Sequence, residues 1–180
     1  MEEITNSKER TDAKLRYARL HLEELRAHQR KGSGDDFERS HQESFLFHLV
    51  SARDAFLQEL NLYYGGGLKP REVTADKLTE KLKKMGVECP ELDKLKRYEN
   101  PECWLHVAKE MRNHSTHRDS MPRAFHVGGE DDGKVFLRNT QSRKLIKKDY
   151  ADTFEEWCSK LENLLNDLRN TAVSRYQPNR

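Results

Sequence analysis

The longest segment with apolar residues at helical spacing, residues 35 to 64, sets the strongest limit on the fold. Its apolar side chains lie on two adjacent faces of a helix: Phe45, Leu49, Ala52, Phe56, Leu60 and Tyr63 on one, and Leu46, Val50 and Leu57 on the other. A helix that is apolar over so wide an arc must be covered by neighbours on more than one side. The segment therefore predicts a central helix in a helical protein.

Four further segments place apolar residues on one face of a helix: residues 7 to 31, 74 to 85, 100 to 117 and 153 to 171. Three of these segments have N-cap signals, namely Thr74 preceded by Val73, Asn100 followed by Pro101, and Thr153 followed three residues later by Glu156. Between residues 123 and 147, two short apolar runs flank a turn rich in glycine and aspartate, which predicts a β-hairpin.

We therefore predict an all-α protein, an up-and-down bundle of four to five helices with a small β-hairpin in its C-terminal half. A chain of 180 residues is long enough for one substantial core and short for two, so a single domain over residues 1–180 is expected. Its core would comprise about residues 35–120 and the helix 150–171, with the hairpin at about 123–147 as an insertion.

Composition argues against several kinds of partner and site. The net charge of +2 is nearly balanced, so any affinity for nucleic acid must come from a local patch. Neither the acidic N-terminus nor any later run resembles a signal peptide or a membrane span, so a cytoplasmic protein without membrane contact is expected. The three cysteines are widely separated and the eight histidines lack ligand spacing, so we predict no metal site and no cofactor.

Cationic and hydrogen-bonding side chains concentrate at the end of the helix that precedes residue 118. Arg112 and His117 have four residues between them, and Asn113 and His114 lie in that interval. Arginine can hold two phosphate oxygens in its planar fork, and histidine titrates near neutral pH. The same residues also suit a solvated helix end, where the helix dipole favours cations. The residue pattern alone leaves both interpretations open.

The segment from Arg112 to His117 resembles the R-x4-6-H motif of the HEPN superfamily, which ends a helix of a small bundle. The segment from Ser51 to Asn61 is similar to the long second helix of such proteins. The resemblance covers roughly residues 35 to 118 and the last helix, without the hairpin. It implies a HEPN-like helical domain and a metal-independent endoribonuclease with a role as a toxin or antiviral-defence effector.

The resemblance implies that Arg112, His117 and Asn113 are catalytic. His117 would act as base or acid, Arg112 would stabilise charge on the phosphate, and Asn113 would orient the phosphate or His117. Residues five apart in a regular helix lie about 140° apart around its axis, so one helix cannot easily direct Arg112 and His117 at the same atom. HEPN ribonucleases are typically homodimers whose two motifs share a cleft, and we expect a homodimer here too.

RNA is the partner that the resemblance implies. His114, Arg118 and Arg123 are further candidates for RNA binding, although solvation of a charged surface explains each of them equally well. A cognate antitoxin or inhibitor protein is another expected partner. The alternative is a non-catalytic HEPN-like module that binds nucleotides or RNA, or that mediates protein interactions.

Overall fold

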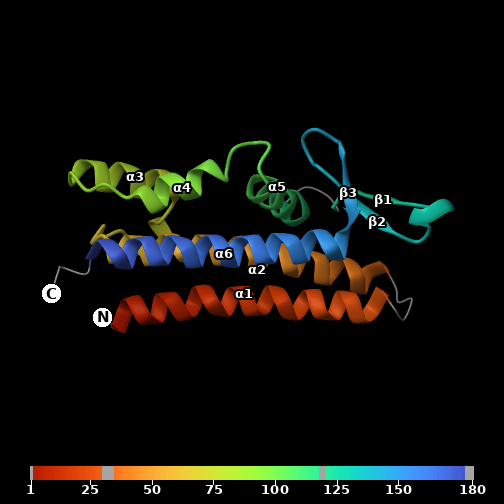
Figure 1. The fold of residues 1–180 in the computed structure, drawn as a ribbon, viewed down its shortest axis with the longest axis horizontal. Coiled ribbons are helices and arrows are strands. Elements are labelled where there is room, and N and C mark those ends of the chain that lie inside the picture. Colours follow the sequence, from red (N-terminus) through yellow and green to blue (C-terminus); the bar gives the residue numbers. More distant parts are fainter. Residues whose placement is uncertain (1, 30–34, 118–120, 177–180) are drawn as a thin grey trace.

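The computed structural model describes residues 2–29, 35–117 and 121–176, and within these ranges it describes only the backbone of Gln29, His117 and residues 173–176. Three long helices lie side by side and form the body of the molecule (Figure 1). They are α1 (Glu2–Gln29), α2 (Asp35–Tyr63) and α6 (Tyr150–Tyr176). No helix in the described ranges combines the length and the apolar character needed to cross a membrane.

The core lies between the three long helices because each directs an apolar stripe inward. Besides α2, the buried residues are Leu15, Ala18, Leu22 and Leu25 of α1 and Phe154, Trp157, Leu161, Leu164 and Leu168 of α6. Phe45 of α2 stacks on Phe154 of α6 with ring centres 4.2 Å apart. The central position predicted for the segment 35 to 64 is confirmed, since α2 packs against α1, α5 and α6.

Three shorter helices lie over α2 and α6 on the side away from α1 (Figure 1). They are α3 (Ala75–Lys84), α4 (Pro90–Arg97) and α5 (Trp104–His117). Thr74 caps α3 as the sequence predicts, because its Oγ1 accepts a hydrogen bond from the backbone N–H of Lys77 at 3.2 Å. This layer brings the end of α5 close to the middle of α2.

The described residues contain six helices, more than the four to five that the sequence predicts. The additional helix is α4, which is eight residues long and buries Leu92 and Leu95. Two apolar positions in two turns are too few for a periodic pattern to stand out. The protein is therefore mainly helical, as predicted, with one short helix that the pattern did not distinguish.

Two predicted N-caps are wrong. Helix α6 begins at Tyr150, where the predicted range 150–171 begins, but its cap is Asp149 and not Thr153, because the Asp149 side chain accepts a hydrogen bond from the N–H of Ala151 at 3.0 Å and so satisfies the first turn. The Thr153 hydroxyl instead donates to the carbonyl of Asp149 at 2.9 Å. Helix α5 begins at Trp104, and the predicted start at Asn100 is a turn.

A three-stranded antiparallel sheet lies at the end of the bundle where α2 begins (Figure 1). Its strands are β1 (Arg123–Phe125), β2 (Val135–Arg138) and β3 (Leu145–Asp149), in the order β1-β2-β3. The predicted hairpin is confirmed as β1 and β2, with Ala124 opposite Phe136. The third strand was missed because its lysines give it the pattern of a solvated charge run.

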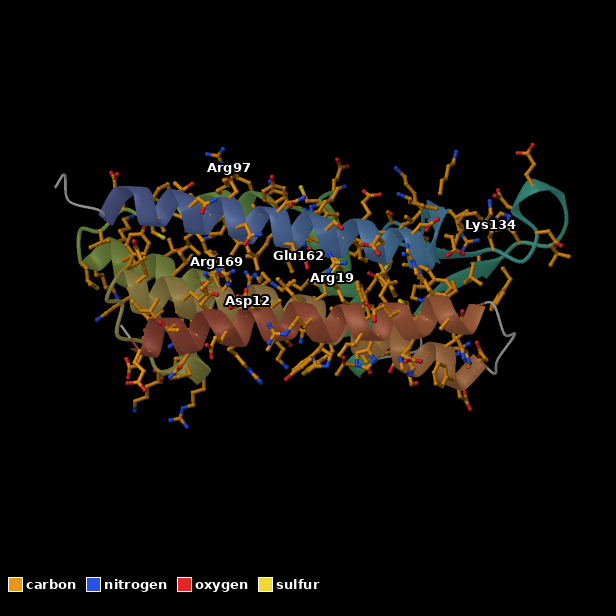
Figure 2. All side chains as sticks on the ribbon, turned by 60° about the horizontal axis from the view of Figure 1, so that its bottom comes forward. Asp12, Arg19, Arg97, Lys134, Glu162 and Arg169 are labelled. Atoms are coloured by element: carbon orange, nitrogen blue, oxygen red, sulfur yellow. The ribbon has the colours of Figure 1, made fainter. Side chains whose placement is uncertain are left out.

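Buried ion pairs join the three long helices (Figure 2). Arg169 of α6 donates to Glu59 of α2 through two nitrogens, at 2.7 and 2.9 Å, and to Asp12 of α1 at 2.8 Å. These partners outweigh the effect of burial and raise the pKa of Arg169. Arg19 of α1 bridges to Glu162 of α6 in a more exposed position. Among the side chains that the structure describes, the Arg169 network is the one set of ion pairs that links all three helices.

Four of the eight histidines line the junction between α1 and α2, which we call the histidine seam: His21 and His28 of α1, and His41 and His48 of α2. Each pair is seven residues apart, so each stays on one face of its helix. The Nδ1 atoms of His21 and His41 lie 3.1 Å apart, and the rings of His21 and His48 stack at 5.5 Å. The seam is therefore a row of aromatic rings between the two helices, in which Phe37 separates His28 from His41.

The histidine seam favours neutral imidazoles. Burial, followed by the charge of Lys14, lowers the pKa of His48 to about 4. Burial and His41 lower the pKa of His21, against a smaller opposing effect of Glu24. Two protonated rings at the separation of His21 and His41 would repel each other. Neutral forms of His21 and His48 therefore stabilise the seam more than their protonated forms do.

The first prediction concerns the Arg169 network. Arg169→Met keeps most of the side-chain volume but leaves Glu59, with 9% of its side chain exposed, without its cation. We expect this variant to lose about 3 kcal/mol of unfolding free energy in urea titrations. Arg19→Met, the matched control at a side chain that is 35% exposed, should lose about 1 kcal/mol or less. Equal losses of unfolding free energy in the two variants would contradict the stabilising role of the Arg169 network.

The second prediction concerns pH. Because the folded-state pKa of His48 and His21 is below that of a free histidine, about 6.5, their contribution to stability is complete above pH ~6.5 and falls as the pH drops towards 4. Thermal unfolding of wild type should therefore show a larger drop in midpoint between pH 7.5 and 5 than that of His48→Gln. Parallel pH profiles for the two proteins would rule out the seam as the cause.

Candidate functional site

Helix α5 carries the predicted motif and ends at His117. It packs on α2 through Leu105, Ala108 and Met111, which recur at three residues and are buried. Arg112 follows Met111 directly, so its backbone starts beside the buried face and its side chain reaches across to α2. The motif therefore lies at the end of a helix, as the sequence predicts.

Arg112 is half-buried and faces Asp54 of α2. Its Nη2 lies 3.9 Å from an Asp54 carboxylate oxygen, and 24% of its side chain is exposed. Its Nε is buried and finds no acceptor among the described residues. The guanidinium thus has one loose ion pair and one unused donor, and a buried donor without an acceptor costs about 1–3 kcal/mol. An incoming oxyanion could reach only the exposed part of this side chain, since the Nε itself is buried.

Asp54 belongs to a charged cluster of five side chains, formed by Arg53, Asp54, Glu99, Lys109 and Arg112. Arg53 is almost fully buried and pairs with both carboxylates, Asp54 at 2.8 Å and Glu99. Lys109 of α5 lies 3.7 Å from Glu99. With three cations and two carboxylates, the charged cluster has one positive charge in excess.

The electrostatics of the charged cluster favour an anion. Burial, followed by the charge of Arg53, lowers the pKa of Lys109; Asp54 and Glu110 oppose this effect and Arg112 adds to it. The Nε of Arg53, like that of Arg112, is buried without an acceptor among the described residues. A bound phosphate would relieve the repulsion among the cations and accept hydrogen bonds from arginine donors. The arrangement is therefore suited to hold a phosphate group at Arg112.

The other predicted site residues differ in what the structure says of them. The His117 backbone ends α5, but its side chain and the whole of Arg118 lie outside the described residues, so their predicted roles stay predictions. Asn113 and His114 are half-buried on α5. Since α5 is helical through His117, the Cα positions of Arg112 and His117 lie about 140° apart around its axis, as expected for a regular helix.

Arg123 does not join the charged cluster. Only 3% of its side chain is exposed, because it pairs with Asp35 and, at 3.4 Å, with Glu38 at the start of α2. Its guanidinium also lies over the ring of Phe125, 5.3 Å from the centroid. Arg123 therefore holds β1 against α2, and we leave it out of the site proposed below.

The sequence reasoning missed Arg53, Asp54, Glu99 and Lys109. A signal for Arg53 was present, because it falls at helical spacing between Val50 and Leu57 on the second apolar face of the central helix. An arginine at such a position must find buried partners. Its partner Glu99 comes from a separate segment, and nothing in the local sequence around Glu99 points to α2.

The described residues include no group of three or more His, Cys, Asp or Glu side chains arranged to hold a metal ion. No family model, curated protein or solved structure matches the chain significantly. The candidate site therefore rests on the geometry around Arg112 and on the residue pattern from Arg112 to His117.

The third prediction tests whether the charged cluster binds phosphate. Inorganic phosphate should raise the thermal unfolding midpoint of wild type, and Arg112→Ala should remove that effect. Asp54→Asn removes a competing carboxylate and should tighten phosphate binding by up to about fivefold, since exposed ion pairs contribute at most about 1 kcal/mol.

The control for this experiment is Asp76→Asn, the same substitution at a carboxylate that is 87% exposed and pairs with Lys96. Sulfate and chloride, each added at the ionic strength of the phosphate sample, separate oxyanion binding from general screening. Sulfate should also raise the unfolding midpoint, whereas chloride should not. A phosphate-induced shift that persists in Arg112→Ala would show that the anion binds elsewhere.

Proposed function

We propose that the protein is a metal-independent endoribonuclease that acts as a homodimer through Arg112 and His117. The observation that carries the proposal is the position of Arg112, held half-buried in the charged cluster with a buried Nε that lacks an acceptor. The sequence adds a histidine one and a half turns further along the same helix. Arginine and histidine together supply what cleavage of RNA requires.

Cleavage of RNA by its own 2′-hydroxyl needs three functions. A base removes the hydroxyl proton, an acid protonates the leaving 5′-oxygen, and a cation stabilises the charge on the phosphorane. His117 serves as base or acid, since a histidine of ordinary pKa holds both protonation states near neutral pH. Arg112 serves as the cation, and Asn113 orients the phosphate or His117. His114 and Arg118 contact neighbouring phosphates.

The proposed homodimer rests on the resemblance to HEPN ribonucleases, which are typically homodimers, and on the helix geometry. Arg112 and His117 lie on different sides of α5, so one copy of the helix cannot direct both groups at the same phosphate. Two copies related by a two-fold axis bring two histidines and two arginines into one cleft. One His117 then acts as base while the partner's His117 acts as acid. The resemblance to toxins and antiviral-defence effectors suggests that a cognate antitoxin or inhibitor protein controls this activity.

A second candidate function is a non-catalytic module that binds a nucleotide or RNA. The observation that favours it is the completeness of the charged cluster, in which Arg53, Lys109 and Arg112 can hold a phosphate without any contribution from His117. In that case the Arg112 side chain recognises a phosphate group, and no bond is broken. The two candidates differ in one observable, the appearance of RNA fragments.

The fourth prediction separates the two candidates. Purified protein incubated with a mixed pool of RNAs in EDTA should produce fragments that end in 2′,3′-cyclic phosphate. Arg112→Ala and His117→Ala should each reduce cleavage by about 100-fold or more, since acid–base groups and transition-state cations contribute at least that much. Circular dichroism should show unchanged helix content in both variants.

Thr116→Ala is the control for this assay, because Thr116 is exposed beside His117 and its hydroxyl only bonds the Arg112 carbonyl, at 2.8 Å. It should keep wild-type cleavage. Retained cleavage by purified His117→Ala would eliminate the proposed mechanism. Absence of cleavage by a verified dimer across many RNAs would instead support the binding module.

A further inference from the structure

We propose that an exposed surface on α1 and α2, distinct from the charged cluster, binds single-stranded nucleic acid by stacking unpaired bases on aromatic rings. We call it the aromatic patch and define it by Arg10, Lys14 and Tyr17 of α1 and Phe47 and His48 of α2. The proposal concerns binding alone and does not depend on whether Arg112 and His117 cleave RNA.

The aromatic rings of the patch are open to solvent although they belong to two of the three long helices that enclose the core. Phe47 is 47% exposed and Tyr17 is 40% exposed, and the neighbouring Leu20 is 57% exposed. Both rings meet the His48 imidazole edge to face, each at 5.2 Å between centroids. His48 thus fixes the two rings on either side of it, which lowers the entropy that a ligand must overcome to stack on them.

Positive charge lies between these rings. Lys14 Nζ is 5.1 Å from the Phe47 centroid, 6.0 Å from the Tyr17 centroid and 3.5 Å from His48 Nδ1. A cation between two exposed rings matches a nucleic-acid strand, in which each phosphate is flanked by bases that can stack. A purely apolar partner would have to bury this ammonium group without a counter-charge.

The cations of the patch lie close enough to affect one another. Burial, and after it the charge of Arg10, lowers the pKa of Lys14. Burial lowers the pKa of His48, with Lys14, His21 and Arg10 adding to the effect. The cations of the patch therefore repel one another. An anion placed among them would reduce this repulsion, which favours its binding. A phosphate supplies this charge without requiring any particular base.

The patch also lies on the same face of α2 as Asp54, the carboxylate next to Arg112. Phe47 and Asp54 are both exposed and are separated by seven residues, about 10 Å along the helix. A strand of a few nucleotides stacked on Phe47 can therefore reach the charged cluster. This continuity rests on the function proposed above, whereas the stacking itself does not.

The fifth prediction tests the patch with probes that cannot be cleaved. Fluorescence anisotropy should detect binding of a labelled 12-nucleotide single strand, either oligo-dT or fully 2′-O-methylated oligo-U, which lacks the reactive hydroxyl. Phe47→Ala should weaken binding roughly tenfold, in line with the loss of one stacked base, and Phe47→Trp should restore it. Lys14→Gln should reduce the magnitude of the slope of the logarithm of the binding constant against the logarithm of the salt concentration by about 1, which corresponds to one lost phosphate contact.

The matched control is Phe37→Ala, which makes the same substitution at another exposed phenylalanine of α2. The ring of Phe37 is already stacked between His28 at 3.8 Å and His41 at 4.2 Å, so it offers no free face to a base. This variant should bind the single strand as wild type does. The oligo-dT and oligo-U arms decide between DNA and RNA as the preferred strand.

Three results would overturn the proposal. The first is equal affinity of wild type and Phe47→Ala, or no binding by wild type. The second is equally strong competition by a blunt duplex, because paired bases do not expose their faces. The third is a wild-type dimer, seen in sedimentation, that dissociates in Phe47→Ala while the affinity for the single-stranded probe stays the same. That result would show that the patch binds a second copy of the chain.

Discussion

Burial of α2 by α1, α5 and α6 is the interaction on which the rest of the structure depends. Phe45, Leu49 and Phe56 of α2 are almost completely excluded from solvent. Only a narrow strip of α2, which includes Phe47 and Asp54, remains exposed along the middle of the helix. Side chains of several helices therefore meet along that strip, because the surrounding helices leave α2 uncovered there.

Arg53 shows how the packing of α2 creates a charged site. It lies on the face that α5 covers, and a buried guanidinium is tolerated only with well-placed carboxylates. Asp54 and Glu99 meet this requirement, and Glu99 in turn attracts Lys109. The same contacts that fix α5 on α2 therefore place Arg112 among charged side chains.

The junction of α1 and α2 is closed at one end and exposed to solvent further along. Near His28 and His41, the ring of Phe37 is stacked on both sides and the seam is closed. Near His48, the rings of Tyr17 and Phe47 are exposed and accompanied by Lys14. The stacked rings that close the junction at one end thus give way at the other end to exposed rings beside Lys14.

The sequence by itself determined the helical class, the central position of the segment 35 to 64, the first two strands and the location of Arg112 at a helix end. Each of these depends on spacing within one segment, through apolar periodicity or a turn. Only the tertiary structure decided that Arg53, Glu99 and Lys109 surround Arg112, that Arg123 is buried against α2, and that four histidines form one seam. These outcomes depend on contacts between segments far apart in the chain, because local spacing places a side chain on a face of its helix but does not specify what will cover that face.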